Sequence, residues 1–521
     1  MNHHFIAILQ SITNDQRSQA FATAQRAFDH KIETLHDIEV QEGIISSLCV
    51  QLGYILNKGS LEVPSIDIAS VFSIISVVYQ CSDEVREASF AHVGKDLLRM
   101  IFSSFTLVRD TECFGWCSFH IMKVMRALSR LREASIIMAN QEEALTILQI
   151  IILDTVVNLG AKLEAVATLK NITFYAEDVR LDIMNHPGLF DALIKTCTDR
   201  GDDTGREFAS AVIRNIAMAP DTKIPMVEHS SLLDVMVQLM DDQNLKTRRN
   251  AVSAIGSLAI AEENSMIFVT HGEGVILQIM QRLVEEEEDS VIRRRAARAL
   301  RCFGRRETVG MIVDQRGIVQ SLCTAAMNDP SVEAKIEAIE ALSTFVSHTH
   351  VLAPFYNNIL DAIITIANSD PPPSCVEALS KTMNALSCSQ EHRQPMVDHS
   401  DLLWTMISIS SNPSSTGICR EQCASTIYNL TCDEDNRGKM ASKLVLSFLI
   451  MTLSSEYRRE RLSQTYSVKA VANLAAFEKN RKCLVNERDL LHSLIEFAAV
   501  SDNSDTKETV KTAIIQLIAA L

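Results

Sequence analysis

The sequence predicts an all-α protein: a right-handed α-solenoid of about ten to eleven repeats, each roughly 43 residues long. Three observations support this fold class. One short signature recurs at a steady spacing, each period divides into three helical segments, and the composition favours helices. The 521 residues include only 17 glycines and 11 prolines, and 47% of them are hydrophobic. This composition is typical of helices packed around a large aliphatic core.

The signature lies at the end of each period. It reads VMRALS at Val124, TLKNIT at Thr168, VIRNIA at Val212 and TIYNLT at Thr426. We call its fourth residue the anchor. Anchors fall at positions 127, 171, 215, 257, 302, 344, 385, 429, 473 and, shifted by one place, 516. Spacings of 41 to 45 residues are typical of helical-repeat proteins.

Each period is expected to form a short helix, a second apolar helix, a polar break and a longer third helix that carries the anchor. In the copy that ends at Ala217, these parts are EDVRLDIMNHPGL, FDALIKTCTDRGDDTG and REFASAVIRNIA. The breaks contain turn-forming residues, as in RGDDTG from Arg200 and SDPPPS from Ser369.

These periods resemble the armadillo repeat of the β-catenin and importin-α families. The resemblance is carried by the stretch from Glu262 to Leu300, and by EDNRGKMASKLVLSFLIMTL followed by SVKAVANLAAFEKNRKCLV. It covers residues 82–521. We expect residues 1–81 to form an N-terminal helical cap containing one candidate degenerate repeat, because terminal repeats need a polar outer face.

The resemblance implies that the third helices line a concave groove that holds an extended peptide. An Asn at the anchor would then hydrogen-bond the backbone of that peptide. The chain has this residue at Asn171, Asn215, Asn429 and Asn473, but other residues stand at Ala127, Ser257, Cys302, Thr344 and Ala385. Importin-α also places Trp four residues before the Asn, and no copy here has it.

The most unusual stretch is EEEEDSVIRRRAARALRCFGRR, from Glu285 to Arg306. At 100° per residue, four arginines share an arc of about 60° on the predicted third helix. These residues, the arginine stripe, are Arg294, Arg298, Arg301 and Arg305. Ile292, Ala296, Ala299, Leu300 and Phe303 fall on the opposite arc and are predicted core. Because this helix carries the signature, we predict that the arginine stripe faces the groove.

Further candidate groove cations are Lys170 and Arg214, each just before an anchor, and Arg249. Two interpretations of these cations are open. They could bind an acidic or phosphorylated extended segment through charge-assisted hydrogen bonds. Alternatively they pair within the chain, Arg298 with Glu340 and Arg295 with the acidic run from Glu285 to Asp289. A net charge of −16 argues against nucleic acid or anionic lipid as the ligand.

Two similar pieces, MVEHSSLLD from Met226 and MVDHSDLLW from Met396, place an acid, a His and a Ser together. Because such histidines recur at the repeat spacing, we expect them to mark a turn and help to cap a helix rather than to catalyse a reaction. The cysteine pairs Cys113 with Cys117 and Cys419 with Cys423 are interpreted as core residues. The sequence holds no P-loop and no HExxH, so we expect no enzymatic activity, cofactor, metal or small-molecule substrate.

The 13 cysteines include no CxxC pair, and the N-terminal segment lacks a basic region and a long apolar run. The apolar run from Ala144 is interrupted by Asp154 and is too short to span a membrane. The expected location is therefore the cytoplasm or nucleus, and not the exterior of the cell.

The first functional hypothesis is a non-enzymatic scaffold or adaptor that binds a protein partner through an acidic extended segment. The alternative is a regulator that clamps a folded partner, as armadillo-type exchange factors for small GTPases or chaperones do. A nuclear-transport adaptor is disfavoured because the Trp residues are missing.

Overall fold

The computed structural model describes residues 83–518 apart from Cys113, 346–351, 370, 413, 455–459 and 502–503. It also describes a few buried helical positions before residue 83, such as Ile45 and Phe72. The predicted N-terminal cap, 1–81, otherwise lies outside the described residues. The chain divides into two compact units, Met1–Leu258 (unit 1) and Ala259–Leu521 (unit 2), which we treat separately.

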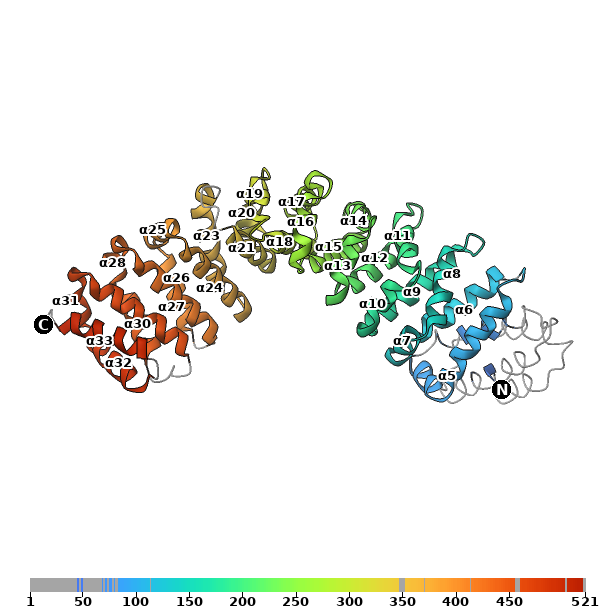
Figure 1. Cartoon of the computed structure of the whole chain (residues 1–521), viewed down its shortest axis with the longest axis horizontal. Helices are drawn as coiled ribbons and strands as arrows, with labels where there is room; N and C mark the ends of the chain where they lie inside the picture. Colours follow the sequence, from blue (N-terminus) through green and yellow to red (C-terminus); the bar gives the residue numbers. More distant parts are fainter. Residues whose placement is uncertain are drawn as a thin grey trace. The chain divides into compact units, whose positions relative to one another are not determined.

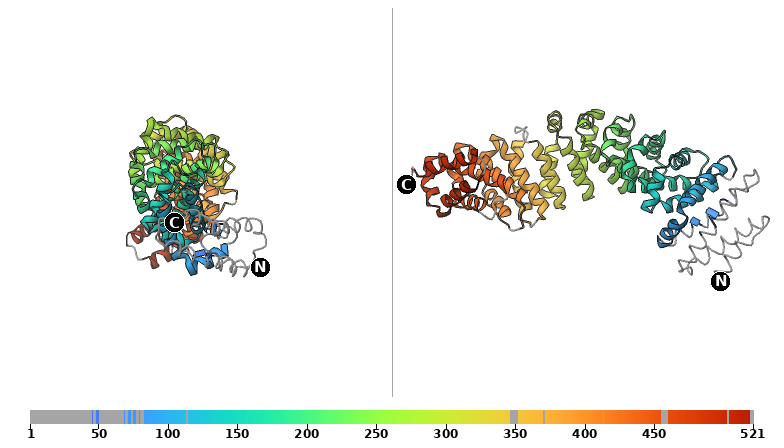
Figure 2. Two further views of the ribbon diagram at one scale, coloured as in Figure 1. Left: turned by 90° about the vertical axis from the view of Figure 1, so that its right-hand side faces the viewer. Right: turned by 60° about the horizontal axis from the view of Figure 1, so that its bottom comes forward.

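Unit 1 consists of successive helices in which every third one is long and carries an anchor (Figure 1). Its helices are α5 (Asp83–Val108), α6 (Phe114–Leu128), α7 (Arg132–Ala139), α8 (Glu142–Leu153), α9 (Leu159–Tyr175), α10 (Arg180–Asn185), α11 (Leu189–Thr198), α12 (Asp203–Ala217), α13 (Lys223–Glu228), α14 (Leu232–Met240) and α15 (Leu245–Leu258). Short 3₁₀ turns, η3 (Glu177–Val179) and η4 (Pro220–Thr222), precede α10 and α13. The third helices α6, α9, α12 and α15 pack side by side in chain order (Figure 2).

Unit 2 continues the same order of elements. Its helices are α16 (Ser265–Thr270), α17 (Val275–Glu286), α18 (Ser290–Phe303), α19 (Val309–Asp314), α20 (Ile318–Asn328), α21 (Val332–Thr344), α23 (Tyr356–Ala367), α24 (Pro373–Cys388), α25 (Gln390–Asp398), α26 (Leu402–Ser411), α27 (Gly417–Cys432), α28 (Glu434–Met440), α29 (Lys443–Leu453), α30 (Arg461–Ala476), α31 (Glu478–Asn486), α32 (Arg488–Val500) and α33 (Ser504–Ile518). Its 3₁₀ turns are η5 (Glu262–Asn264), η6 (His271–Gly274) and η7 (Ala353–Phe355). The third helices α18, α21, α24, α27, α30 and α33 pack in sequence.

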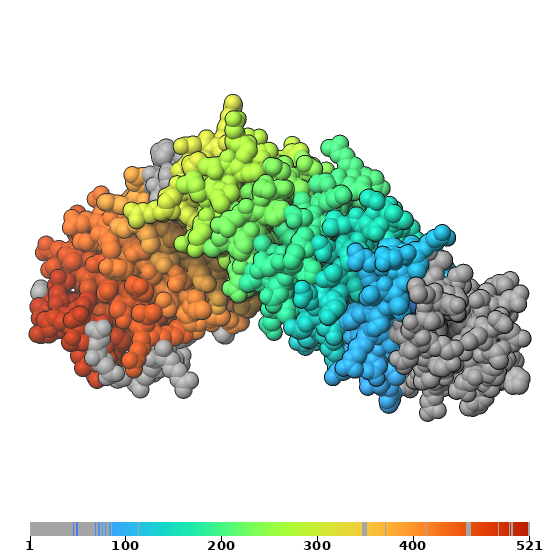
Figure 3. Space-filling model, turned by 45° about the vertical axis from the view of Figure 1, so that its right-hand side comes forward, coloured from blue at the N-terminus to red at the C-terminus, as the bar shows by residue number. Residues whose placement is uncertain are grey.

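The predicted fold class is confirmed: the chain is an all-α solenoid, and the described residues form no strand. The anchors lie within the third helices, toward their carboxyl ends. The predicted core of α18 is also confirmed, because Ile292, Ala296, Ala299, Leu300 and Phe303 are all fully buried. On the face drawn in Figure 3, successive repeats adjoin one another in chain order within each unit.

Arginines in the first turn of third helices, with side chains that are largely out of solvent, tie one repeat to the next. Arg293 Nε lies 2.6 Å from Asp329 Oδ2, and its Nη1 donates to the carbonyl oxygen of Glu287 at 2.8 Å. Arg206 pairs in the same way with Asp242 at 2.6 Å, and Arg420 with Glu460 at 2.6 Å. Each guanidinium thus bonds both the loop before its own helix and an acid of the following repeat. We call these contacts the arginine clasps.

A second set of arginines, on first helices, bonds the carboxyl end of the preceding third helix. Their Nε atoms donate at 2.9 to 3.1 Å to backbone carbonyls, from Arg180 to Thr173, Arg393 to Ser387, Arg437 to Thr431 and Arg481 to Ala475. These bonds satisfy carbonyl groups that a helix end leaves unpaired, and a cation there complements the helix dipole.

The histidines of the two similar pieces mark the turn between the first two helices, as expected, but the expectation that they help to cap the next helix was wrong. His229 Nε2 lies 3.1 Å from Asp191 Oδ1, and His399 Nε2 lies 3.2 Å from Asp361 Oδ1. In both cases the acid belongs to the second helix of the preceding repeat. The helices that follow, α14 and α26, begin without a side-chain cap. The histidine spacing therefore reflects a contact between repeats.

The cysteines Cys117, Cys419 and Cys423 are fully buried, whereas Cys113 lies outside the described residues. No cluster of three or more His, Cys, Asp or Glu side chains suited to a metal ion occurs among the described residues. No single described helix is both long and apolar enough to cross a membrane, although two bent helix pairs satisfy that test by length and composition.

Candidate functional site

The side chains just before the anchors meet the next repeat in a regular way. Six of them contact the residue that lies seven positions before the following anchor. The pairs are Arg126 with Glu164, Lys170 with Phe208, Arg214 with Asn250, Arg301 with Glu337, Asn384 with Gln422 and Tyr428 with Tyr466. Side chains of an α-helix lean toward its amino end, which explains why each contact runs backward along the next helix.

In unit 1 two cations lie against the Phe208 ring, and two more lie close to one of them. Lys170 Nζ lies 4.6 Å from the ring centroid of Phe208, and the Arg126 guanidinium carbon lies 5.7 Å from it. Arg214 on α12 and Lys246 on α15 are close enough to act electrostatically on Lys170. We call Arg126, Lys170, Arg214 and Lys246 the cation cluster.

Among the described residues, two carboxylates pair with members of the cation cluster. Glu164 lies 3.0 Å from Arg126, and Glu207 lies 3.1 Å from Lys246. Lys170 and Arg214 form no ion pair with any described residue. Arg214 instead donates to two neutral amide oxygens, those of Asn250 and Asn215, each at 2.9 Å.

The surroundings of Lys170 and Arg214 disfavour their charged forms. Burial lowers the pKa of Lys170, and Arg126, Lys246 and Arg214 add to this effect against the opposing charge of Glu207. Burial and the charge of Arg180 likewise lower the pKa of Arg214. Both charged forms are therefore less stable in the folded chain than in water. An anion bound between them would offset this cost.

Arg249, the remaining predicted cation of unit 1, is half-buried on α15. It precedes Asn250, which holds α15 against α12 by donating to Ser210 Oγ at 3.1 Å and to the carbonyl oxygen of Glu207 at 3.2 Å. Sequence reasoning missed Phe208 and Lys246. A signal was available for Phe208, because it stands seven residues before its anchor, where Glu164 and Asn250 stand in the adjacent repeats.

In unit 2, half of the arginine stripe is paired within the chain. Arg301 pairs with two carboxylates of α21, Glu340 and, at 3.3 Å, Glu337. Arg305 lies 3.2 Å from Glu262 and also donates to the carbonyl oxygen of Ile260 at 3.3 Å. Pairing within the chain thus occurs in this region, but not as expected, because Glu340 pairs with Arg301 instead of Arg298. The reason is the backward lean of side chains, which makes contacts diagonal rather than level. The expected pairing of Arg295 with the acidic run from Glu285 to Asp289 stays a prediction.

The other two arginines of the stripe form no ion pair with a described residue. Arg298 is exposed, whereas Arg294 is half-buried. Arg294 does act on Glu333 of α21: its charge contributes to lowering the pKa of that carboxyl, after the larger effects of the Glu333 backbone N–H and the Ser331 hydroxyl. Arg298 is therefore the most accessible charge of the stripe.

All four anchor asparagines bond the preceding repeat. Their Nδ2 atoms donate to hydroxyl oxygens at 2.9 to 3.2 Å, from Asn171 to Ser129, Asn215 to Thr173, Asn429 to Ser387 and Asn473 to Thr431. Asn215 is buried, and its Oδ1 accepts from Arg214. The other three asparagines are half-buried.

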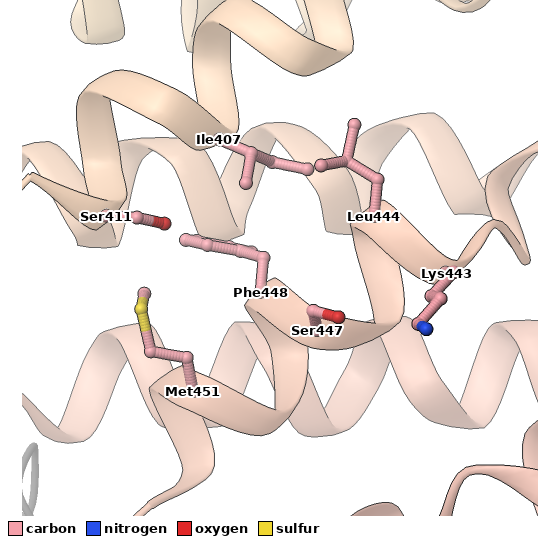
Figure 4. Close-up of a pocket in the computed structure, with 7 residues that line it drawn as sticks. All are labelled: Ile407, Ser411, Lys443, Leu444, Ser447, Phe448 and Met451. Carbon is pink, nitrogen blue, oxygen red and sulfur yellow. The ribbon is translucent and has the colours of Figure 1, made fainter.

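A hollow of about 480 Å³ lies in unit 2 between α26 and α29, on second helices rather than third helices (Figure 4). Its walls are mostly apolar, and it is lined by Ile407, Ser411, Lys443, Leu444, Ser447, Phe448 and Met451. It holds a single titratable side chain, so it is suited to an apolar group and not to chemistry.

Comparisons with known proteins define the fold and nothing finer. No family model matches the chain, and no curated protein matches it. Among solved structures, an engineered protein is 18% identical with a TM-score of 0.67, over 80% of this chain and 98% of its own. A structure from a study of a phosphorylation switch in the interaction between cadherin and β-catenin is 12% identical, with a TM-score of 0.64, over 99% of this chain and 100% of its own. At these identities the likeness shows that the chain shares a helical-repeat solenoid fold with both.

Proposed function

We propose that the protein is a non-enzymatic scaffold or adaptor of the armadillo type. Its third helices α6, α9, α12 and α15 would bind an extended acidic segment of a protein partner. The observation that carries this proposal is the cation cluster, in which Lys170 and Arg214 have no carboxylate partner among the described residues.

The energetics favour an anionic ligand at this place. Hydrogen bonds between an ionised donor and an ionised acceptor contribute about 1.5–3 kcal/mol each when well formed. Because Lys170 and Arg214 are already partly desolvated, a carboxylate that reaches them gains more than it would at an exposed cation. The net charge of −16 restricts attraction of anions to such local clusters.

The cation cluster, and not the arginine stripe, would then make the main contact with the acidic segment. Arg301 and Arg305 already have carboxylate partners, so a ligand would have to displace those carboxylates. Arg298, together with Arg294, is left as a second contact within unit 2. Asn171 would bond the backbone of a segment bound to unit 1, and Asn429 and Asn473 that of a segment bound to unit 2. Asn215 is buried and already bonds Arg214 and Thr173, so it is not available to a ligand.

Phosphorylation of the bound segment should strengthen the interaction. A phosphoryl group carries a charge of about −1.5 to −2 at neutral pH and three acceptor oxygens. One such group placed between Lys170 and Arg214 would supply both missing counter-charges. The comparison with a structure from a study of a phosphorylation switch supports testing phosphorylated segments first.

A displayed library of 16-residue segments tests the proposal on the full chain. Segments selected by binding should be rich in Asp, Glu or phosphoserine, and their affinity should fall with added salt. Changing Lys170→Glu together with Arg214→Glu should lower that affinity at least about tenfold, as expected from losing one or more charge-assisted bonds.

The matched control is Lys195→Glu together with Arg200→Glu. Both of these residues are exposed on or just after α11, and the double change alters the net charge by the same amount. The control should leave affinity within about twofold. Selected segments without acidic residues, or equal losses in both variants, would count against the proposal.

A further inference from the structure

The hydroxyl groups that meet the anchor asparagines have a fixed hydrogen-bonding role. Each hydroxyl lies two residues after an anchor and donates its own hydrogen to the backbone carbonyl three residues earlier. The distances are 2.8 Å from Ser129 to Arg126, 3.1 Å from Thr173 to Lys170, 2.7 Å from Ser387 to Asn384 and 2.7 Å from Thr431 to Tyr428. The Thr173 hydroxyl also lies 2.9 Å from the carbonyl oxygen of Leu169, four residues earlier.

This arrangement decides how each asparagine amide is oriented. A hydroxyl has one hydrogen, and when that hydrogen is donated to a carbonyl, the oxygen can only accept. The asparagine must therefore turn its NH₂ group toward the hydroxyl, as the structure shows. Its carbonyl oxygen, Oδ1, then points away from the preceding repeat. The Oδ1 atoms of Asn171, Asn429 and Asn473 accept no hydrogen bond from any described residue.

The chain places the hydroxyls only where they are needed. The residue two places after an anchor is Ser or Thr in every copy whose next anchor is Asn. It is Ala, Gly or Val in the copies that precede Ser257, Cys302, Thr344, Ala385 and Gln516. The result is two blocks of three repeats with the same order, ALS, NIT and NIA at anchors 127, 171 and 215, then ALS, NLT and NLA at anchors 385, 429 and 473.

We propose that Ser129, Ser387 and Thr431 are positioning residues. They orient the amides of Asn171, Asn429 and Asn473 so that Oδ1 is presented as an acceptor to the main-chain N–H groups of a bound segment. Each block thus offers acceptors, not donors, to the partner backbone. The proposal rests on the proposed function, because it requires that a segment binds along the third helices.

Among the described residues, the NH₂ group of Asn171 bonds only the Ser129 hydroxyl, whereas Asn429 Nδ2 also donates to Asn384 Oδ1 at 3.3 Å and Asn473 Nδ2 to Cys432 Sγ at 3.7 Å. Ser129 is therefore the residue to test, and Asn215 supplies an internal control. Its Oδ1 already accepts from Arg214 at 2.9 Å, and its Nδ2 also donates to the carbonyl oxygen of Lys170 at 3.3 Å. Its orientation is therefore held without Thr173. Removing the Thr173 hydroxyl should leave segment binding unchanged, whereas removing the Ser129 hydroxyl should not.

The experiment uses the full chain and the tightest segment from the displayed library, together with versions of it in which one backbone amide at a time is replaced by an ester. An ester lacks the N–H donor. In the unmodified protein, one ester near Asn171 should weaken binding about three- to tenfold, the effect of one hydrogen bond. In Ser129→Ala this penalty should fall below about twofold, because the freed amide can turn and donate instead.

Thr173→Val, which keeps the shape of the side chain, should retain the full ester penalty, and so should Ser129→Thr, which keeps a hydroxyl. Ser129→Cys preserves volume but accepts hydrogen bonds poorly, so it replaces Ser129→Ala if that variant does not fold.

An ester penalty that is unchanged in both Ser129→Ala and Ser129→Cys overturns the positioning role while leaving the proposed function intact. Tight binding that is insensitive to Lys170→Glu with Arg214→Glu, or a library that yields no binder, overturns the proposed function and this inference with it.

Discussion

His120 shows how a single side chain in unit 1 responds to pH. Its ring lies against two aromatic rings, with centroids 5.1 Å from Trp116 and 5.4 Å from Phe119. Its Nδ1 atom is buried and bonds no described residue. Burial, with a smaller contribution from Lys123, lowers the pKa of His120 to about 4. Between about pH 6.5 and pH 4, the imidazole of His120 therefore stays neutral in the folded chain, whereas a histidine in the unfolded chain becomes protonated.

This pKa predicts a loss of stability in mild acid. Above the unfolded pKa of about 6.5 both states carry a neutral ring, so the contribution of His120 to stability is complete. Below that value the unfolded chain binds a proton that the folded chain does not, and stability declines until the pH reaches about 4.

Fluorescence of Trp116 in a Trp404→Phe background measures this titration directly, since protonated His120 beside the indole should quench it. We expect a midpoint near pH 4 and its disappearance in His120→Gln. A midpoint near 6.5 would show that the ring is solvated.

At the scale of helices, the arginine clasps explain how loops and third helices keep their register. Asp329 is buried and the Arg293 side chain is only 12% exposed, and the Asp329 hydrogen bond raises the pKa of Arg293. Removing one partner of a buried pair leaves an uncompensated charge, which costs about 3–5 kcal/mol.

Asp329→Ala should therefore lower the free energy of unfolding of unit 2 by about that amount. Denaturant unfolding followed with hydrogen exchange in α20 and α21 measures the change. Glu508→Ala, which removes an exposed pair with Lys511, is the control and should have little effect. Equal behaviour of the two variants would mean that the clasp contributes no more than a surface ion pair.

Most of the fold was predictable because the anchors mark one element type at a steady spacing. The burial of Ile292, Ala296, Ala299, Leu300 and Phe303 follows from helical phase alone. Helical phase does not predict which side chains of neighbouring repeats pair with each other. Aligning the repeats position by position predicts that Arg298 pairs with Glu340. In the structure Glu340 pairs with Arg301 instead, because helical side chains point toward the amino end of their helix. The role of His229 was missed for the same reason, because its partner Asp191 lies on another repeat.

The candidate site was predicted in part. Lys170 and Arg214 were identified from their place before an anchor, and the structure brings them together within the cation cluster. The arginine stripe is the more strongly charged stretch of the sequence. Two of its four arginines, however, pair with the side chains of Glu262, Glu337 and Glu340. No sequence pattern of charge alone separates a paired arginine from an unpaired one. The hydroxyls beside the anchors were visible in the sequence, but their meaning required the hydrogen bonds.

At the scale of the whole molecule, stability should be local. Repeats contact mainly their neighbours, so opening one repeat weakens the adjacent ones and leaves distant ones unchanged. Leu474 on α30 is fully buried, and α30 packs against α27 and α33.

Leu474→Ala should cost about 2–5 kcal/mol and raise hydrogen exchange in α27, α30 and α33. Exchange in unit 1 should not change. The matched variant Leu169→Ala, fully buried on α9, should instead affect α6, α9 and α12. A uniform rise across both units in either variant would show that the chain unfolds as one cooperative body.

The paired hydroxyls and asparagines also determine how such a chain can grow. The copies at anchors 171 and 429 carry both members of the pair, an Asn at the anchor and a Thr two residues later. If either copy were duplicated in tandem, the Asn of the duplicate would bond the Thr of the original copy. The Thr of the duplicate would in turn bond the Asn of the copy that follows, so each of these polar groups would have a partner. The first and last copies of a block carry only one member and act as its ends. Gene duplication or protein engineering can therefore lengthen each block at its middle copy, and every added copy brings one more acceptor with it.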